Sequence, residues 1–143
     1  MTPEKIELVP SSFAKVAPIA PQAADIFYTK LFAAAPGVRP LFPDDMKEQK
    51  MKLMTMLGVA VNGLTRLDEI VPAVQALGRR HTNYGALEEH YPVVGAALLA
   101  TLEEGLGDVW TSDHAEAWGE AYALLSGVMI DAAKEAAGVW PGG

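Results

Sequence analysis

The chain has 143 residues, of which 50% are hydrophobic and 20% are charged, and it contains no cysteine. The lack of cysteine excludes a disulfide framework, thiolate zinc or iron–sulfur sites and thiol catalysis. The formal net charge of −7 argues against nucleic acid or an anionic membrane as the main partner.

The first residues, 1–5, show no basic region before an apolar run, so no signal peptide is expected. The longest apolar stretch, 53–61, is far shorter than the ~20 residues of a membrane span. We therefore expect a cytoplasmic protein with one domain over residues 1–143, whose tail over 138–143 is frayed.

The distribution of the prolines predicts an all-α fold. Residues 44–71 and 93–140 contain none and are rich in helix-forming residues, whereas no sustained period-two pattern or hairpin dipeptide indicates a strand. Six or seven helices of unequal length favour a wrapped helical fold over a symmetric four-helix bundle. In chain order the sequence first predicts a helix over Pro18–Ala35, a corner over Pro36–Pro43 and a helix over Lys47–Leu64. The next helix begins at the capping box Thr65–Asp68 and runs to Thr82. A helix from Pro92 ends at a left-handed Gly107, and the last helix is capped by Thr111, Ser112 or Asp113.

Four polar residues stand where the helical period requires apolar ones: Tyr28, Gln49, His81 and Tyr91. Each alone is most often structural, since a tyrosine on an apolar face usually bonds a backbone carbonyl. His81 has no zinc-ligand spacing around it, and the chain shows no nucleophile motif and no phosphate loop. A single inward histidine fits a metal that brings its own equatorial ligands, as iron does in haem.

Five of the basic residues lie beside two of these positions: Lys47, Lys50 and Lys52 near Gln49, and Arg79 and Arg80 near His81. They are either solvated helix surface, or partners of haem propionates, for which we select Lys52 and Arg80, or a landing site for an electron donor.

These residues resemble those of a globin, and in particular the single-domain bacterial globins and the haem domain of flavohaemoglobins. The resemblance runs from about Phe13 to Met129. It is carried by Phe27-Tyr28 with Leu31-Phe32, Pro36 followed by Leu41-Phe42, Gln49 four residues before Leu53, Leu77-Gly78-Arg79-Arg80-His81, His90-Tyr91-Pro92-Val93-Val94-Gly95, and Trp118-Gly119 with Ala121-Tyr122.

The resemblance implies non-covalently bound haem b with His81 as axial ligand and Tyr91 as its support. Phe42 would pack flat on the porphyrin, and Leu77 and Val94 would complete the apolar pocket. Tyr28 and Gln49 would stabilise the gas ligand on the distal side, where Leu53 would keep out water. Dioxygen at such a site gains partial negative charge, so a hydrogen-bond donor in a dry cavity stabilises it.

The expected function is reversible binding of dioxygen, nitric oxide and carbon monoxide, for storage or transport. A Tyr–Gln pair is also typical of bacterial globins that oxidise nitric oxide to nitrate, which here would need an external reductase. In flavohaemoglobins a glutamate on the last helix joins the proximal pair, but Ala133 falls at that place, between Asp131 and Glu135. The alternatives are a haem-based gas sensor and a cofactor-free globin-like interaction module.

Overall fold

The computed structural model describes residues 2–83 and 89–136, and the side chains of residues 81–83, 135 and 136 lie outside that description. Within these ranges every regular element is helical, which confirms the predicted all-α class. The α-helices are α1 (Pro3–Val16), α2 (Ala20–Ala34), α3 (Lys47–Asn62), α4 (Leu67–Asn83), α5 (His90–Leu106) and α6 (Ser112–Ala136). Short 3₁₀ segments join them: η1 (Ala17–Ile19), η2 (Pro36–Leu41), η3 (Leu64–Arg66) and η4 (Gly107–Val109).

Helix α1 was not predicted from the sequence, which placed the first helix at Pro18. Pro10 lies inside α1, where a proline removes one backbone donor and disfavours a helix. The helix forms because Val9, Phe13 and Val16 are buried along one side of it, in the core of the protein. Burial of this face outweighs the cost of the proline.

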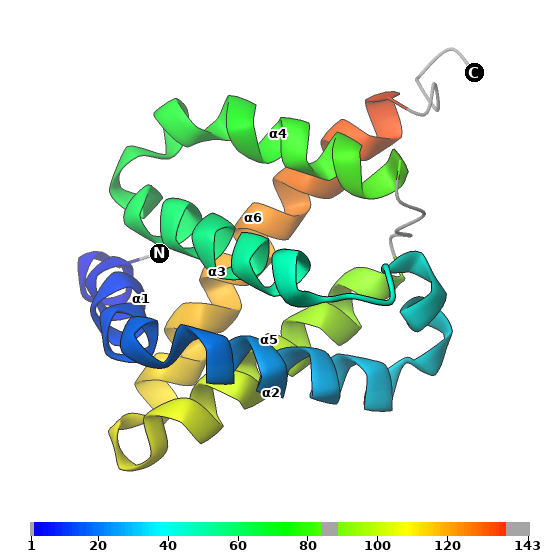
Figure 1. Cartoon of the computed structure of the whole chain (residues 1–143). Coiled ribbons are helices and arrows are strands. Elements are labelled where there is room, and N and C mark those ends of the chain that lie inside the picture. Colours follow the sequence, from blue (N-terminus) through cyan, green and yellow to red (C-terminus); the bar gives the residue numbers. More distant parts are fainter. Residues whose placement is uncertain (1, 84–88, 137–143) are drawn as a thin grey trace.

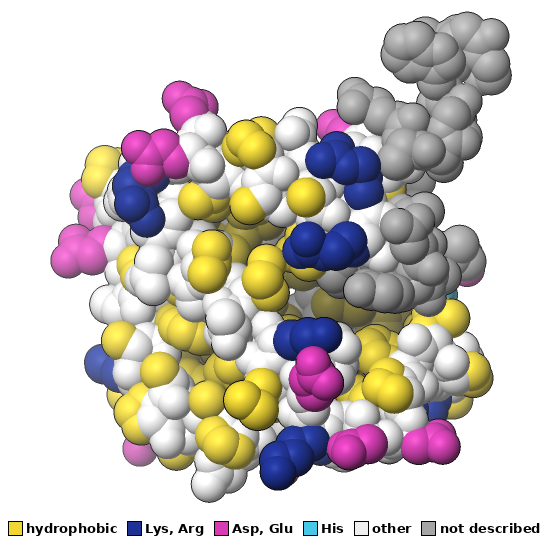
Figure 2. Space-filling model, turned by 45° about the horizontal axis from the view of Figure 1, so that its top comes forward, with side chains coloured by type: hydrophobic (Ala, Val, Ile, Leu, Met, Phe, Trp, Pro, Cys, Tyr) yellow, Lys and Arg dark blue, Asp and Glu magenta, His cyan; other side chains and the backbone are white. Residues whose placement is uncertain are grey.

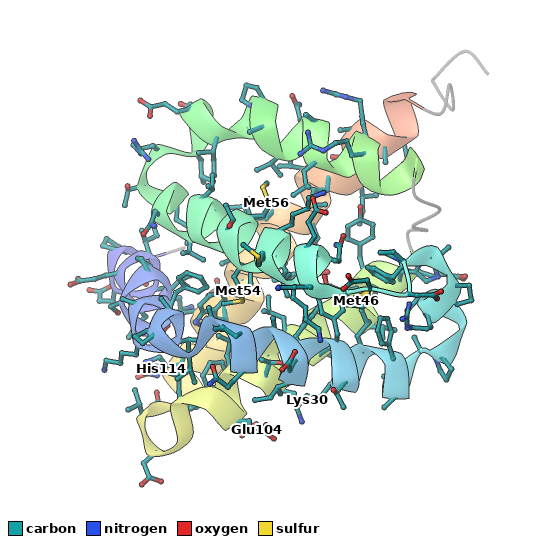
Figure 3. The ribbon with its side chains drawn as sticks, viewed as in Figure 1. Lys30, Met46, Met54, Met56, Glu104 and His114 are labelled. Carbon is teal, nitrogen blue, oxygen red and sulfur yellow. The ribbon has the colours of Figure 1, made fainter. Side chains whose placement is uncertain are left out.

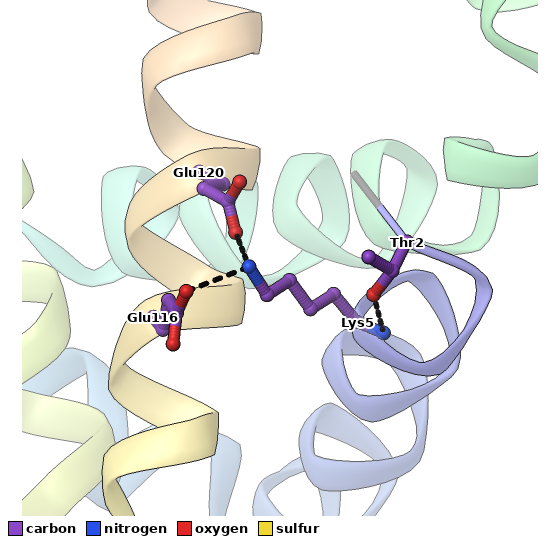
Figure 4. Close-up of polar contacts among 4 residues, drawn as sticks. All are labelled: Thr2, Lys5, Glu116 and Glu120. Atoms are coloured by element: carbon purple, nitrogen blue, oxygen red, sulfur yellow. Dashed lines mark hydrogen bonds and ion pairs between the residues drawn. The ribbon is translucent and has the colours of Figure 1, made fainter.

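Two contacts of different kinds dock α1 on α6. Lys5 Nζ pairs with Glu116 at 2.7 Å and with Glu120 at 2.5 Å, two carboxylates one helical turn apart (Figure 4). Trp118, which is 2% exposed, donates its indole N–H to Ser12 Oγ at 2.9 Å. The ion pairs lie at the surface, where water and salt screen them, so the buried hydrogen bond is the more specific of the two contacts.

The remaining helix ends lie within about two residues of the predicted ones, a normal uncertainty for helix termini. The 3₁₀ turn η1 delays the start of α2 to Ala20, and η3 delays that of α4 to Leu67. Of the three predicted caps of α6, Thr111 is the one used, because its Oγ1 accepts the His114 N–H at 3.4 Å. Gly107 ends α5 with a φ of 56°, as predicted for a residue without a side chain.

Helices α4 and α5 approach α6 closely at two glycines. A Cβ on Gly78 would overlap the backbone of Met129, and a Cβ on Gly95 would lie 2.6 Å from the Tyr122 ring. Helix α4 therefore rests directly on α6, while α2 packs along α5 (Figure 1). Lys30 and Glu104, 3.6 Å apart, join α2 and α5 at the surface (Figure 3).

Helix α3 lies between α4 and α2 and crosses in front of α6 (Figure 1). It buries only Val61 fully, although its sequence predicts an apolar stripe through Leu53 and Met56. Those two side chains remain half-buried, and Met56 lies on the side of α3 that faces α4 (Figure 3). Leu53 packs against the hydrophobic core, so the stripe is only partly covered by protein.

Candidate functional site

The face of the molecule formed by α3 and α4 is hollowed, and hydrophobic side chains line the hollow (Figure 2). Apolar residues on the helices around it are half-buried rather than buried: Leu53, Met56, Leu77, Val93 and Val94. Lys and Arg side chains stand at its border (Figure 2). An apolar space with cations at its edge suits a flat apolar ligand that carries anionic groups.

A second depression opens on the opposite side of α3, with a volume of about 790 Å³. Its lining includes Ala24, Met51, Lys50 and Asp25. The Lys50 Nζ atom lies 2.7 Å from Asp25 Oδ1. Lys50 is thus engaged in linking α3 to α2, on the side away from the hollow between α3 and α4.

Tyr28 and Gln49, predicted from separate stripes, meet in the structure. Gln49 Nε2 donates a hydrogen bond to Tyr28 Oη at 3.3 Å, and Tyr28 is 4% exposed. Because the phenol oxygen accepts this bond, its own proton remains available to a ligand. Two polar side chains from α2 and α3 thus form one donor pair in apolar surroundings.

Burial raises the pKa of Tyr28 above its ordinary value, and the hydrogen bond from Gln49 lowers it by a smaller amount. Burial dominates because the phenolate would lose its hydration, and one neutral donor cannot replace it. The hydroxyl of Tyr28 is therefore protonated across the physiological pH range, in the form that can donate a hydrogen bond.

Aromatic rings surround the Tyr28 side chain. Phe27 and Phe42 contact it edge to face, at centroid distances of 4.9 and 5.6 Å, and Phe32 lies 5.7 Å away. Phe42 also packs against Phe32 at 5.4 Å. Such edge-on contacts fix ring orientation as well as burying area. Phe42, predicted to stack on haem, is thus part of the same cluster as Tyr28, predicted to lie on the distal side.

Arg39 is a residue of this region that the sequence reasoning missed. Its guanidinium donates to the backbone carbonyls of Phe42, Pro43 and Asp44 at 3.0–3.3 Å, and it lies over the Phe32 ring at 5.2 Å. No periodic pattern could reveal it, because it lies in the corner between helices. An arginine amid prolines was the only signal available.

On the opposite side, helix α4 carries the predicted ligand position. Val74 is buried and Leu77 half-buried, and residue 81 follows Leu77 by one helical turn in the same continuous helix. The side chain of His81 itself lies outside the described residues, so its role stays a prediction. The close seat of Gly78 on Met129 fixes this turn of α4 on α6.

Tyr91 is half-buried at the start of α5, and its backbone carbonyl accepts the Tyr122 hydroxyl proton at 2.6 Å. Burial raises the pKa of Tyr91. It also raises the pKa of Tyr122, to which the neighbouring Tyr91 adds a smaller effect. Tyr122 thus connects α6 to the segment that contains Tyr91. Its ring can lie close to α5 because Gly95 has no side chain.

The two residues predicted to hold propionates lie on the facing helices. Lys52 is 64% exposed and pairs with Glu48 at 3.5 Å within α3, a weak surface contact. Arg80 is exposed on α4, next to Arg79. Both side chains can therefore turn toward an incoming anion with little rearrangement.

The end of α6 contains the position at which the sequence departs from flavohaemoglobins, and that departure stays a prediction. Ala133 is half-buried and Asp131 is exposed, while the side chain of Glu135 is outside the described part of the chain. Over the residues that the structure covers, no group of three acidic or histidine side chains gathers to hold a metal ion. In the same residues, no helix is long and apolar enough to cross a membrane.

The helical fold and the apolar hollow between α3 and α4 together define an all-α protein of the globin class. A family model described as Globin matches residues 25–129, and the chain belongs to that family. It is 33% identical over 123 residues to a flavohemoprotein of Halalkalibacterium halodurans, covering 82% of this chain and 30% of that protein. It is 34% identical over 110 residues to a flavohemoprotein of Pseudomonas aeruginosa, covering 74% and 28%. The chain thus spans about a third of the length of these curated relatives.

Solved structures show the same fold. A bacterial globin from Campylobacter jejuni superposes with a TM-score of 0.84 at 27% identity, over 94% of this chain and 97% of that one. A flavohemoglobin from Malassezia yamatoensis, solved with bound FAD and heme, gives a TM-score of 0.78 at 18% identity over 94% of this chain and 37% of that one. At that identity, the second comparison supports the fold alone.

Proposed function

We propose that this protein binds haem b in the hollow between α3 and α4 and there reversibly binds dioxygen, nitric oxide and carbon monoxide. The observation that carries the proposal is the hydrogen bond from Gln49 to the buried hydroxyl of Tyr28, on a globin fold. The bond supports the proposal because the Tyr28 oxygen accepts from Gln49 and so keeps its own proton for a ligand.

The residues around the hollow fit the group. Haem, when bound, would supply an iron that binds a protein side chain and a diatomic gas. The imidazole of His81 would be that protein ligand, with Tyr91 as its support. Phe42, Leu53, Leu77 and Val94 would cover the porphyrin faces with apolar surface, and Lys52 and Arg80 would pair with the propionates.

On the distal side, Tyr28 and Gln49 would determine which gas ligand is bound more tightly. The Tyr28 hydroxyl, kept protonated by burial, would donate to the gas ligand, and Gln49 would hold that hydroxyl in place. A ligand that gains negative charge, such as dioxygen, benefits more than carbon monoxide does. Leu53 would exclude water from this side.

Nitric oxide dioxygenation is the second candidate function, favoured by the same Tyr28–Gln49 pair. In this reaction one dioxygen, one nitric oxide and one electron give one nitrate, and the electron would come from an external reductase. Arg79 and Arg80 are exposed, and such cations would attract an acidic electron donor. Ala133, in place of an acid on α6, predicts slower turnover than in a flavohaemoglobin with a complete proximal network.

Absorption spectra of the ferric, ferrous and carbonmonoxy forms test the first proposal. We expect a Soret band that moves when carbon monoxide is added, and a changed or absent band in the variant His81→Ala. His114→Ala is the matched control, because His114 bonds Thr111 at the far end of the fold. A protein supplied with haem that shows no Soret band would instead be the cofactor-free interaction module.

The second candidate function is tested by mixing oxygen-loaded protein with nitric oxide in stoichiometric amounts. One nitrate per protein is expected, and release of unreacted dioxygen would restrict the protein to storage or transport.

A further inference from the structure

We propose that Arg39 is a positioning residue: its guanidinium fixes the connection between η2 and α3, and so holds Gln49 against Tyr28. The inference rests on the proposed function for its kinetic readout. It goes beyond that function by naming a residue which would touch neither the haem nor the gas.

Three consecutive backbone carbonyls converge on the Arg39 side chain. Nη1 donates to the carbonyls of Phe42 and Pro43 at 3.3 and 3.0 Å, and Nη2 donates to that of Asp44 at 3.3 Å. The Arg39 carbonyl in turn accepts the Phe42 N–H at 3.1 Å. Both the backbone and the side chain of Arg39 therefore hydrogen-bond to the residues that follow it in the corner.

Residues 42–46 belong to no helix, so these carbonyls have no partner from regular structure. A guanidinium has five N–H groups in a rigid fork, and it can serve several carbonyls at once, which a lysine ammonium on a flexible stem does less well. Phe32 supports the fork from one side, with its ring centroid 5.2 Å from the guanidinium carbon.

The clamped segment has both of its ends at Tyr28. It begins at Phe42, whose ring contacts the Tyr28 ring at 5.6 Å, and it leads into α3, where Gln49 in the first turn contacts the Tyr28 hydroxyl at 3.3 Å. Slack in this segment would let the first turn of α3 move relative to α2. The hydrogen bond of 3.3 Å is already long, so a small displacement would break it.

Other contacts also hold the start of α3: Met46 is buried in the core, and Lys50 pairs with Asp25 at 2.7 Å. The ion pair is partly open to water, so salt screens it, whereas Arg39 donates to three backbone carbonyls at once. Arg39 is the side chain that bonds the backbone of the connection leading to Gln49, and this is the contact that the proposal concerns.

The test compares Arg39→Gln and Arg39→Lys with Ser12→Ala, a remote variant that loses the Trp118 hydrogen bond and so controls for general loss of stability. The dioxygen dissociation rate is expected to rise about threefold to tenfold in both Arg39 variants, the size of effect expected for one lost hydrogen bond. Ser12→Ala should change it less than twofold. Full rescue by lysine would mean that charge alone matters, and would overturn the clamp.

A double-mutant cycle separates positioning from simple destabilisation. In a Gln49→Leu background the further change Arg39→Gln should alter the dissociation rate less than twofold, since the contact it positions is already gone. Equal effects of Arg39→Gln with and without Gln49 would show that the arginine does not act through this contact, and would overturn the proposal.

A measurement without bound gas tests the positioning role of Arg39 independently of the proposed gas-binding function. The side-chain amide resonance of Gln49, identified by its loss in Gln49→Leu, is measured in ¹⁵N-labelled protein as purified. It should move toward the position of a solvent-exposed amide in both Arg39 variants and stay in place in Ser12→Ala. A shift in protein that binds no haem would uphold the positioning role and refute the proposed function; an unmoved resonance would refute the positioning role.

Discussion

At the scale of single residues, the direction of one hydrogen bond decides what the pocket can offer a ligand. Gln49 donates and Tyr28 accepts, so the phenol keeps a proton that points elsewhere. Since burial also raises the pKa of Tyr28, that proton stays in place at neutral and mildly alkaline pH. In the proposed function, the amide would act on the gas ligand through the tyrosine.

The variant Tyr28→Phe tests this arrangement. Its dioxygen dissociation rate should rise by about tenfold or more, because a hydrogen bond to a charged group contributes ~1.5–3 kcal/mol. The measurement is a stopped-flow displacement of dioxygen by carbon monoxide. Tyr122→Phe makes the same chemical change on the α5–α6 side, where the hydroxyl bonds the Tyr91 carbonyl, and should leave the rate within twofold. Equal rates in Tyr28→Phe and the unmodified protein would remove Tyr28 from the mechanism.

The sequence was informative at this scale where a polar residue interrupts an apolar stripe. Tyr28 and Gln49 were both found in this way, and the structure brings them together. Arg39 and Phe32 were not assigned roles, because their partners are backbone carbonyls and rings that only the folded corner assembles. Hydrophobic periodicity identifies the buried face of a helix, but it does not predict the contacts made by a connection between helices.

At the scale of helices, the seat of α4 on α6 depends on the absence of a side chain. Gly78 lies against the Met129 backbone, and because a backbone cannot rotate away as a side chain can, α4 itself would have to move. That turn of α4 precedes the predicted axial histidine. The glycine therefore fixes the depth at which position 81 lies in the fold.

The variant Gly78→Ala should lower the free energy of unfolding by about 1–3 kcal/mol, the usual cost of overpacking, despite the higher helix propensity of alanine. Urea denaturation followed by circular dichroism measures this. Gly127→Ala is the matched control on α6, where a Cβ meets nothing within 4 Å. There the alanine should stabilise the protein by about 0.8–1 kcal/mol. A stabilised Gly78→Ala would show that α4 does not rest on α6 at this point.

Helix positions were largely predictable, because prolines and caps mark them locally. Thr111 caps α6 and Gly107 ends α5 as expected from residue type alone. Helix α1 was missed because its evidence is not local: Pro10 argues against a helix, and the side chains that stabilise it contact α6, more than a hundred residues away.

At the scale of the whole molecule, three buried or half-buried tyrosines make the fold sensitive to alkali. Burial raises the pKa of Tyr28, Tyr91 and Tyr122 above the ordinary value near 10. The folded state thus holds these protons more tightly than the unfolded chain does. Their contribution to stability is complete below about pH 10 and is lost as the pH rises through the folded-state pKa values.

Urea unfolding at a series of pH values should therefore show the free energy of unfolding falling above about pH 10. Each of the three tyrosines contributes a slope of up to about 1.4 kcal/mol per pH unit. Tyr122→Phe should reduce the slope in this range. A slope unchanged by Tyr122→Phe would show that this phenol ionises alike in both states.

Removal of haem is expected to lower the stability of the whole fold. A ligand that binds only the folded state adds about 4.1 kcal/mol when present at a thousand times its dissociation constant. The melting temperature of the protein, measured by calorimetry before and after haem extraction, should fall by several degrees and recover when haem is returned. In His81→Ala the recovery should be smaller, and equal recovery would indicate that haem is held by the apolar walls alone.

The hollow between α3 and α4 also has a consequence for the life of the chain in a cell. Leu53, Met56, Leu77 and Val94, on the helices around it, are only half-buried in the protein itself, and α3 has a single fully buried residue to anchor it. Such a chain opens more often, and proteases and chaperones act on opened chains. The supply of haem would then govern how much of this protein accumulates, so its abundance would follow iron and porphyrin metabolism even at a constant rate of synthesis.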